Sequence, residues 1–344
     1  MKVKMHLSIL VAVLLFCSSA FSQVTMGGSK GLLRVYDAET VYPGILYINP
    51  FYLGYFTEKT GGSAEDHNLN LSFTVGLSKL FEVFAHTVPY QDDQTHVWGP
   101  IGDTKLGLKF AVPNKGSIVK YGLVAFASFP TGVSHNVPYE PFSLDRYGWG
   151  LLGVMNIDLR NASATVPLKF SLNLGYRDHD WNDRYFADKK DQLLAGLGFK
   201  FPIRSSILYS EVTGELFINN TEEVPLSYNS IRFTQGIRFL GPWDLIVDFA
   251  ADVDLSGYTI DGNNEVNESP FVKDYADWKV ILGITYSTKL FTYLTPGEKL
   301  ARKKQKEEQR KLESIRQQRQ KVAKELEELR KNLEKEKRQK EPPN

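Results

Sequence analysis

The chain has 344 residues, of which 42% are hydrophobic, 12% aromatic and 24% charged, so its composition is that of a folded protein. The formal net charge of +1 gives no reason to expect nucleic acid as a partner. This balance hides a split along the chain. Residues 298–341 hold 17 Lys and Arg against 10 Asp and Glu, and the first 22 residues add two lysines, which leaves the residues between with a net charge of −8. An acidic, aromatic and Gly-rich body is joined to a basic tail.

The first 22 residues have the pattern of a secretory signal peptide. Two lysines precede an apolar run over residues 7–17, which is too short to span a bilayer as a helix. Ala20 and Ser22 are small residues at the −3 and −1 positions, so we expect cleavage before Gln23. The domain order predicted here therefore begins with a signal peptide, residues 1–22.

The only cysteine, Cys17, allows a lipoprotein as the alternative interpretation of this segment. Phe16, however, occupies the position where a lipid-attachment sequence has a small residue. Cleavage before Gln23 removes Cys17, so we expect the mature chain to have no disulfide and no cysteine metal site.

Beyond residue 22 hydrophobic and polar residues alternate with a period of two, which predicts β-strands. In residues 168–177, for example, Leu172 and Leu174 fall on one face and Asn173 falls on the other. Most predicted strands have ten residues or more, whereas globular strands average about five or six and a tilted membrane strand needs roughly 9–11. The twelve predicted strands are residues 45–57, 68–78, 81–89, 101–111, 118–129, 147–159, 167–177, 190–201, 206–217, 227–239, 243–254 and 276–288.

The predicted links alternate between long and short along the whole chain, and the short ones contain turn formers such as Pro113, Pro202 and Gly241. Outer-membrane barrels have short periplasmic turns and long extracellular loops. We therefore predict an all-β transmembrane barrel of about 12 antiparallel strands over residues 45–291, with long loops extracellular and both termini periplasmic. Residues 23–44 are expected to be a periplasmic lead-in. The alternative, a soluble β-sandwich or secreted barrel, predicts shorter strands and no loop asymmetry.

Short motifs at both ends of the predicted barrel add a family resemblance. The opening Gly31-Leu32-Leu33-Arg34-Val35, then Ala38-Glu39-Thr40 and Pro43-Gly44, resembles the start of barrels in the broad OmpA-like and porin-like group. The last strand ends at Phe291, with Gly283 and Tyr286 spaced as in the barrel assembly signal and Thr288 departing from it. Over about residues 28–291 the chain resembles bacterial outer-membrane β-barrel proteins. The resemblance implies outer-membrane lipid and the barrel assembly machinery as partners, without a C-terminal peptidoglycan-binding globular domain.

The basic tail, residues 298–340, has no Gly and no aromatic residue and predicts a periplasmic charged helix. Its apolar residues follow a heptad spacing in which Arg319 fills one core position. The tail is therefore expected to form a coiled coil with a second copy or with another periplasmic helix. A single solvated helix is the alternative. The predicted seam residues are Leu312, Ile315, Val322, Leu326, Leu329 and Leu333.

Charged residues occupy predicted inward positions on several strands, and neighbouring strands from residue 206 to 254 carry negative, positive and negative charge in turn. Cross-strand ion pairs follow from this order. They could fill the bore or form a charged constriction that selects ions. The candidate lumen residues are Asp103, Lys105, Lys109, Glu211, Glu215, Arg232, Arg238, Asp244, Asp248 and Asp252.

No pattern in the sequence predicts catalysis, a metal site or a cofactor. The chain has six histidines, but no HExxH, no lipase-like Ser/His spacing and no Gly-rich phosphate loop. The acidic stretch from Asp178 to Asp183 lacks the glycine and glutamate of an EF-hand and is expected to be a solvated loop. We therefore expect no enzyme. The sequence favours a porin-like channel for small solutes or ions, with a structural or scaffolding barrel of occluded lumen as the alternative.

Overall fold

The computed structural model describes residues 23–59, 62–92, 101–113, 116–132, 146–161, 167–181, 191–203, 205–218, 229–241, 245–256, 276–294 and 297–317. The predicted signal peptide, Asp244 and the seam positions from Val322 onward lie outside these residues. Chain contacts divide the protein into two units, Met1–Thr292 and Tyr293–Asn344.

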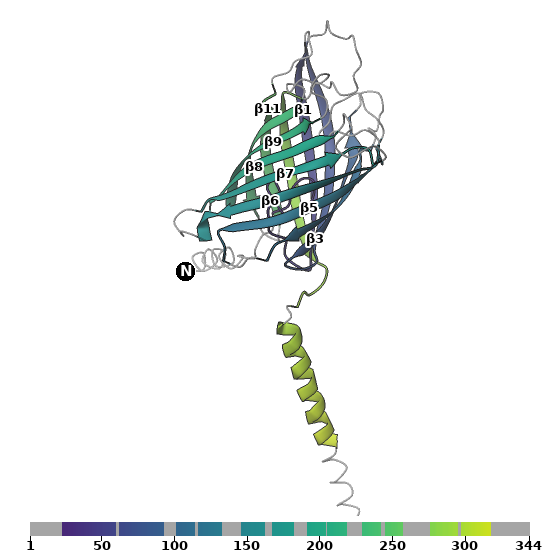
Figure 1. Ribbon diagram of the computed structural model, residues 1–344, viewed down its shortest axis with the longest axis vertical. Coiled ribbons are helices and arrows are strands. Elements are labelled where there is room, and N and C mark those ends of the chain that lie inside the picture. The colour runs from purple at the N-terminus through teal and green to yellow at the C-terminus, as the bar shows by residue number, and fades with distance from the viewer. Residues whose placement is uncertain are drawn as a thin grey trace, which may run out of the picture. The chain divides into compact units, whose positions relative to one another are not determined.

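The first unit is a closed antiparallel barrel of twelve strands, which confirms the predicted fold (Figure 1). Each strand pairs with the next in the chain, and β1 pairs with β12 to close the sheet. The strands are β1 (Ile45–Lys59), β2 (Gly62–Gly76), β3 (Phe81–Gln91), β4 (Thr104–Ala111), β5 (Val119–Phe129), β6 (Gly148–Asp158), β7 (Lys169–Asp178), β8 (Gln192–Ile203), β9 (Ser206–Phe217), β10 (Ser230–Leu240), β11 (Leu245–Asp254) and β12 (Trp278–Lys289). A short 3₁₀ helix, η1 (Leu159–Asn161), follows β6.

The first hairpin is longer than predicted. Residues 58–67 were expected to be a loop, but β1 and β2 continue pairing through Thr57–Ala64 to Lys59–Gly62. This segment is polar and Gly-rich, so it has no apolar alternation to reveal a strand. Backbone pairing with the adjacent strand decides its conformation instead.

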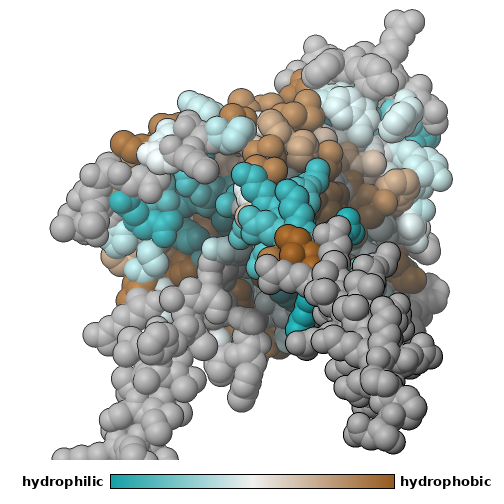
Figure 2. Space-filling view, turned by 90° about the horizontal axis from the view of Figure 1, so that it is seen from below, coloured by the Kyte–Doolittle hydropathy of each residue, from teal (hydrophilic) through white to brown (hydrophobic). Residues whose placement is uncertain are grey.

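Side chains alternate between the inside and the outside of the barrel as the period-two pattern predicts. On β7, Leu172 and Leu174 are 44% and 58% exposed, whereas Asn173 between them is 3% exposed. Figure 2 shows hydrophilic side chains toward the middle of the barrel and hydrophobic side chains mostly around its periphery. The register expected for this strand is correct.

Inward aromatic rings lie against glycines of the neighbouring strand. A Cβ added to any of these glycines would come within 2.0–2.3 Å of the ring, so only glycine leaves room for it. The pairs, each directly opposite in the sheet register, are Phe51–Gly283, Phe84–Gly107, Phe126–Gly150 and Tyr209–Gly236.

The segment expected as a periplasmic lead-in, residues 23–44, lies inside the barrel; we call it the plug. Gly28 and Ser29 have φ of 86° and 71°, and this left-handed turn folds the segment on itself. A Cβ on Gly28 would also lie 2.9 Å from that of Phe84, so the turn packs directly against the wall. Sequence reasoning missed this placement because a short segment without periodicity gives no signal of what it docks against.

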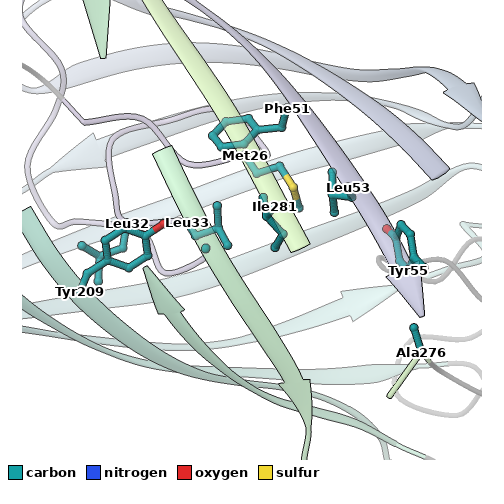
Figure 3. Close-up of a cluster of buried hydrophobic side chains, with 10 residues drawn as sticks. Met26, Leu32, Leu33, Phe51, Leu53, Tyr55, Tyr209, Ala276 and Ile281 are labelled. Atoms are coloured by element: carbon teal, nitrogen blue, oxygen red, sulfur yellow. The ribbon is translucent and has the colours of Figure 1, made fainter. Parts of the chain in front are cut away.

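Apolar plug residues fill the spaces left by the inward aromatics. Met26, Leu32 and Leu33 join Phe51 and Tyr209 in one buried cluster (Figure 3). A second cluster of the plug and the wall contains Val24, Val41 and Tyr47. Burial of these side chains stabilises the plug by roughly 1.5–3 kcal/mol for each large residue, before ordering costs.

In the second unit, residues 297–317 form a helix with every residue exposed. Leu312 and Ile315, two positions of the predicted seam, are 66% and 46% exposed. Within the described residues, no helix is long and apolar enough to cross a membrane.

Candidate functional site

Two buried carboxylates of the barrel wall bind the backbone of the plug. The first is Glu82 on β3, whose Oε1 accepts hydrogen bonds from Ser29 Oγ at 2.5 Å and Lys30 N at 2.9 Å. Its Oε2 accepts one from Val41 N at 2.5 Å. The Lys109 ammonium on β4 lies 2.9 Å from Glu82 Oε1, and both side chains are fully buried. Glu82 therefore joins two parts of the plug, Ser29–Lys30 and Val41, to one point of the wall.

The second is Glu211 on β9, which accepts the N–H groups of three consecutive plug residues. The distances to its oxygens are 2.8 Å from Leu33 N, 2.9 Å from Arg34 N and 3.2 Å from Val35 N. A carboxylate that receives several N–H groups in a buried site is held in one orientation, and removing it leaves buried donors unsatisfied.

Two asparagines on neighbouring strands continue this pattern along the plug. Asn173 on β7 receives Tyr36 N at 2.6 Å and donates to Tyr36 O at 2.9 Å. Asn156 on β6 receives Ala38 N at 3.0 Å and donates to Asp37 at 2.9 Å. Each amide satisfies backbone groups that would otherwise be buried without a partner.

A charge cluster surrounds the plug where it approaches Lys169, the first residue of β7. Lys169 Nζ lies 2.5 Å from Asp37 and 3.5 Å from Glu39, and Lys30 Nζ lies 2.9 Å from Glu39. Lys120 on β5 also pairs with Glu39. Burial by itself raises the pKa of Asp37, but the Lys169 and Lys30 ammonium groups outweigh it and hold that pKa well below its usual range.

A second cluster joins the plug to the last strands. Asp252 on β11 lies 2.6 Å from Arg34 of the plug, 3.1 Å from Arg232 and 3.8 Å from Lys279. Among the described residues, hydrogen bonds or ion pairs thus connect the plug to β2 to β7 and to β9 to β11, besides its continuation into β1. The plug therefore reaches across the bore.

Some of the predicted lumen charges form ion pairs in the structure and others do not. Arg238 Nε lies 2.8 Å from Asp248, and Arg232 lies near Asp252, so the expected pairs between β10 and β11 exist. The expected pairing of Glu211 with an arginine of β10 does not, because its oxygens bind the plug backbone instead. Asp244 lies outside the described residues.

The remaining predicted residues lie toward the long-link end of the barrel. Lys105 and Glu215 are partly buried and line a cavity, and Asp103, just before β4, accepts a hydrogen bond from Gly132 N at 3.3 Å. Sequence reasoning did not include Glu82, Asn156, Lys169 or Asn173 among the candidate lumen residues, although it placed Asn173 on the inward face of its strand. All four occupy inward positions of predicted strands, so the same alternation could have found them.

The cavity has a volume of about 140 Å³ and lies between the plug and the wall. Plug residues Arg34 and Tyr36 form one side. Wall residues from β3 to β10 form the other, among them Phe84, His86 and Phe126. The site as a whole thus consists of the plug, bound to the wall, and one cavity beside it.

The stretch expected to be a solvated acidic loop is buried where the structure describes it. Asp178, His179 and Asp180 are 1–3% exposed, and His179 Nε2 lies 2.7 Å from Gln192 Oε1. Among the described residues, no group of three or more His, Cys, Asp or Glu side chains could hold a metal ion. These residues lie at the end of β7, where His179 contacts Gln192 of β8, Asp178 lies opposite Trp149 of β6 and Asp180 pairs with Arg146.

Comparisons with known proteins bear on the fold. No protein-family model and no curated protein matches the sequence. An outer-membrane channel from Pseudomonas putida F1 has a TM-score of 0.50 at 12% identity, over 73% of this chain and 98% of that one. A KdgM porin and a NanC porin give 0.45 and 0.44 at 7% and 8% identity, over 70% and 69% of this chain and 99% and 98% of theirs. At these identities the likeness to the Pseudomonas putida F1 channel shows the barrel fold, while the narrower OmpA-like grouping stays a prediction.

Proposed function

We propose that the protein is an outer-membrane, porin-like channel for small solutes or ions, with its lumen closed by the plug. The observation that carries the proposal is a closed barrel with a charged interior, into which residues 23–44 fold and are held by non-covalent contacts. Apolar side chains such as Leu172 and Leu174 cover the outside, as lipid requires. The inside holds charged and amide groups, as a path for polar solutes requires.

The orientation is part of the proposal. Short links would face the periplasm, long loops the exterior, and both termini the periplasm. The fold likeness to an outer-membrane channel supports this location. The plug would then enter the lumen from the periplasmic side, where its end joins β1 at Gly44.

The plug is held without covalent bonds, so it is suited to act as a gate. Its contacts are hydrogen bonds, ion pairs and apolar packing, each of which water and lumen groups can replace when the segment leaves. Several such contacts must break together before the plug can leave, and this requirement stabilises the closed state.

A second candidate is a structural or scaffolding barrel whose lumen stays occluded. The observation that favours it is the number of fully buried ion pairs, such as Lys109–Glu82 and Arg238–Asp248. Removing one partner of a buried pair typically costs about 3–5 kcal/mol, so such pairs hold a filled lumen firmly.

Single-channel recording in planar bilayers separates the two. We expect the full chain to conduct rarely and a variant lacking residues 23–42 to conduct steadily. Glu211→Ala should open more often than the full chain, because three plug N–H groups lose their acceptor. Glu65→Ala, an exposed carboxylate on β2, is the matched control and should behave as the unaltered chain. A silent plug deletion that still forms a folded barrel would favour the scaffolding barrel.

A further inference from the structure

The cavity beside the plug has aromatic and aliphatic walls. Phe84, Phe126 and Tyr36 line it together with Leu152 and Leu194. The rings of Phe84 and Phe126 are held in place by Gly107 and Gly150, where any Cβ would collide with them. An engineered apolar cavity of about 150 Å³ takes up benzene, so a space of this size accommodates one aromatic ring.

Positive side chains outnumber negative ones around this space. Arg34, Lys105 and Arg177 line it, against one carboxylate, Glu215. Arg34 already pairs with Asp252 outside the cavity. The lining is therefore cationic next to an apolar floor.

Lys105 is the cation best placed for a ligand. Its ammonium lies 5.7 Å from the centre of the Phe126 ring, a cation–π arrangement. Among the described residues, no carboxylate lies within ion-pair distance of this ammonium, although Glu215 and Asp103 attract it from farther away. By contrast, Lys109, four positions along the same strand, pairs with Glu82. A partly buried ammonium that no carboxylate contacts directly can take a bound anion as its closest partner.

We infer that the cavity binds a small aromatic carboxylate. The ring would lie among Phe84, Phe126 and Leu152, and the carboxylate would receive hydrogen bonds from Lys105 with Arg177 nearby. The inference deepens the proposed function and rests on it, since such a compound is a solute that the channel would take up from the long-loop side.

Isothermal titration of the full chain in detergent, with benzoate as the probe, tests this. We expect saturable binding, with benzyl alcohol, which keeps the ring, and acetate, which keeps the charge, each weaker by about tenfold or more. Equal binding of benzyl alcohol and benzoate would overturn the role of the cations. Equal binding of acetate would overturn the role of the ring, and absence of benzoate binding would overturn the site.

Two variants are expected to change the affinity for benzoate in opposite directions, so a general loss of folding cannot explain both results. Lys105→Met should weaken benzoate binding by about tenfold or more, whereas Glu215→Gln removes the one repelling carboxylate and should tighten it. Lys79→Gln, an exposed lysine in the turn after β2, is the matched control and should change nothing. Unchanged binding in both cavity variants contradicts the inference. The titrations measure binding and not conduction. A negative titration would therefore refute the ligand site alone, whereas a plug deletion that does not conduct would refute the proposed channel.

Discussion

On β7, neighbouring side chains face opposite sides of the barrel wall, so a shift in register by one residue would exchange their roles. Leu172 faces outward and Asn173 faces the plug, where its amide makes hydrogen bonds to both backbone groups of Tyr36. From the sequence, a substitution on the lumen side at residue 173 is expected to be tolerated better than one on the lipid side. The structure changes that expectation, since a large side chain at 173 would displace the plug.

We predict that Leu172→Arg lowers the free energy of unfolding by about 2–4 kcal/mol, because a charge on the lipid face near the middle of a strand must leave water. Urea titration of the protein refolded into lipid vesicles measures the loss. Leu172→Phe, which stays apolar, is the control and should unfold close to the unaltered chain. Equal stability of the arginine variant would mean that residue 172 does not face lipid.

The carboxylates of the plug predict how docking depends on pH. The pKa of Asp37 lies well below its usual range. Burial raises the pKa of Glu39 too, but Lys30, Lys169 and Lys120 outweigh it and hold that pKa well below its usual range. A lowered folded-state pKa contributes stability that is fully present above the unfolded value of about 4 and is lost as the pH falls through the folded value.

We therefore predict that the ion pairs of Asp37 and Glu39 stay formed between pH 7 and pH 5 and begin to weaken only below about pH 4. The Asp37→Asn variant should open more often already at pH 7, because Lys169 loses the closer of its two carboxylates. The difference in open probability between this variant and the unaltered chain, recorded as single-channel current, should persist from pH 7 to pH 5 and shrink below about pH 4. A variant that opens no more often than the unaltered chain at pH 7 would contradict this account.

At the scale of elements, the strands and the tail depend on different neighbours. Each strand has two hydrogen-bonded neighbours, so the barrel leaves no open edge. The tail helix instead exposes Leu312 and Ile315 along its described length. An apolar stripe on an exposed helix needs a second helix to cover it.

We predict that residues 298–340 self-associate or pair with another periplasmic helix, and that deleting them leaves the barrel folded. Crosslinking of the deletion variant should show a smaller apparent oligomer than that of the full chain. Because the segment from 298 to 341 carries seven more positive than negative charges, added salt should weaken any attraction to anionic partners. If the isolated tail peptide stays monomeric and the shortened chain crosslinks as before, the tail is a single charged helix.

At the scale of the whole barrel, closure and filling act together. Lipid provides no hydrogen bonds, so all backbone groups of the sheet must pair within it. The plug then satisfies the charges that the wall turns inward, and the inner surface gains a packed core. Barrel and plug are thus expected to unfold in separate steps, with the weaker contacts of the plug lost first.

We predict that the protein purified in detergent shows a circular dichroism spectrum dominated by β-structure and migrates differently on gels before and after heating. The reason is that a closed sheet resists detergent until heat breaks its pairing cooperatively. The variant lacking residues 23–42 should keep the difference in migration, since the pairing of β1 with β12 does not involve the plug. A mainly helical spectrum would contradict the barrel.

The sequence by itself determined the twelve strands, the inward and outward faces and the presence of ion pairs between β10 and β11, of which Arg238–Asp248 is one. These features depend on a period of two and on the order of neighbouring strands, both of which are written along the chain. Only the tertiary structure decided where residues 23–44 lie, which partner Glu211 takes, and that β1 and β2 extend into a polar hairpin. In each of these cases the interaction joins groups far apart in sequence, such as Glu211 and Leu33, and no local periodicity records a contact that exists only once the sheet has closed.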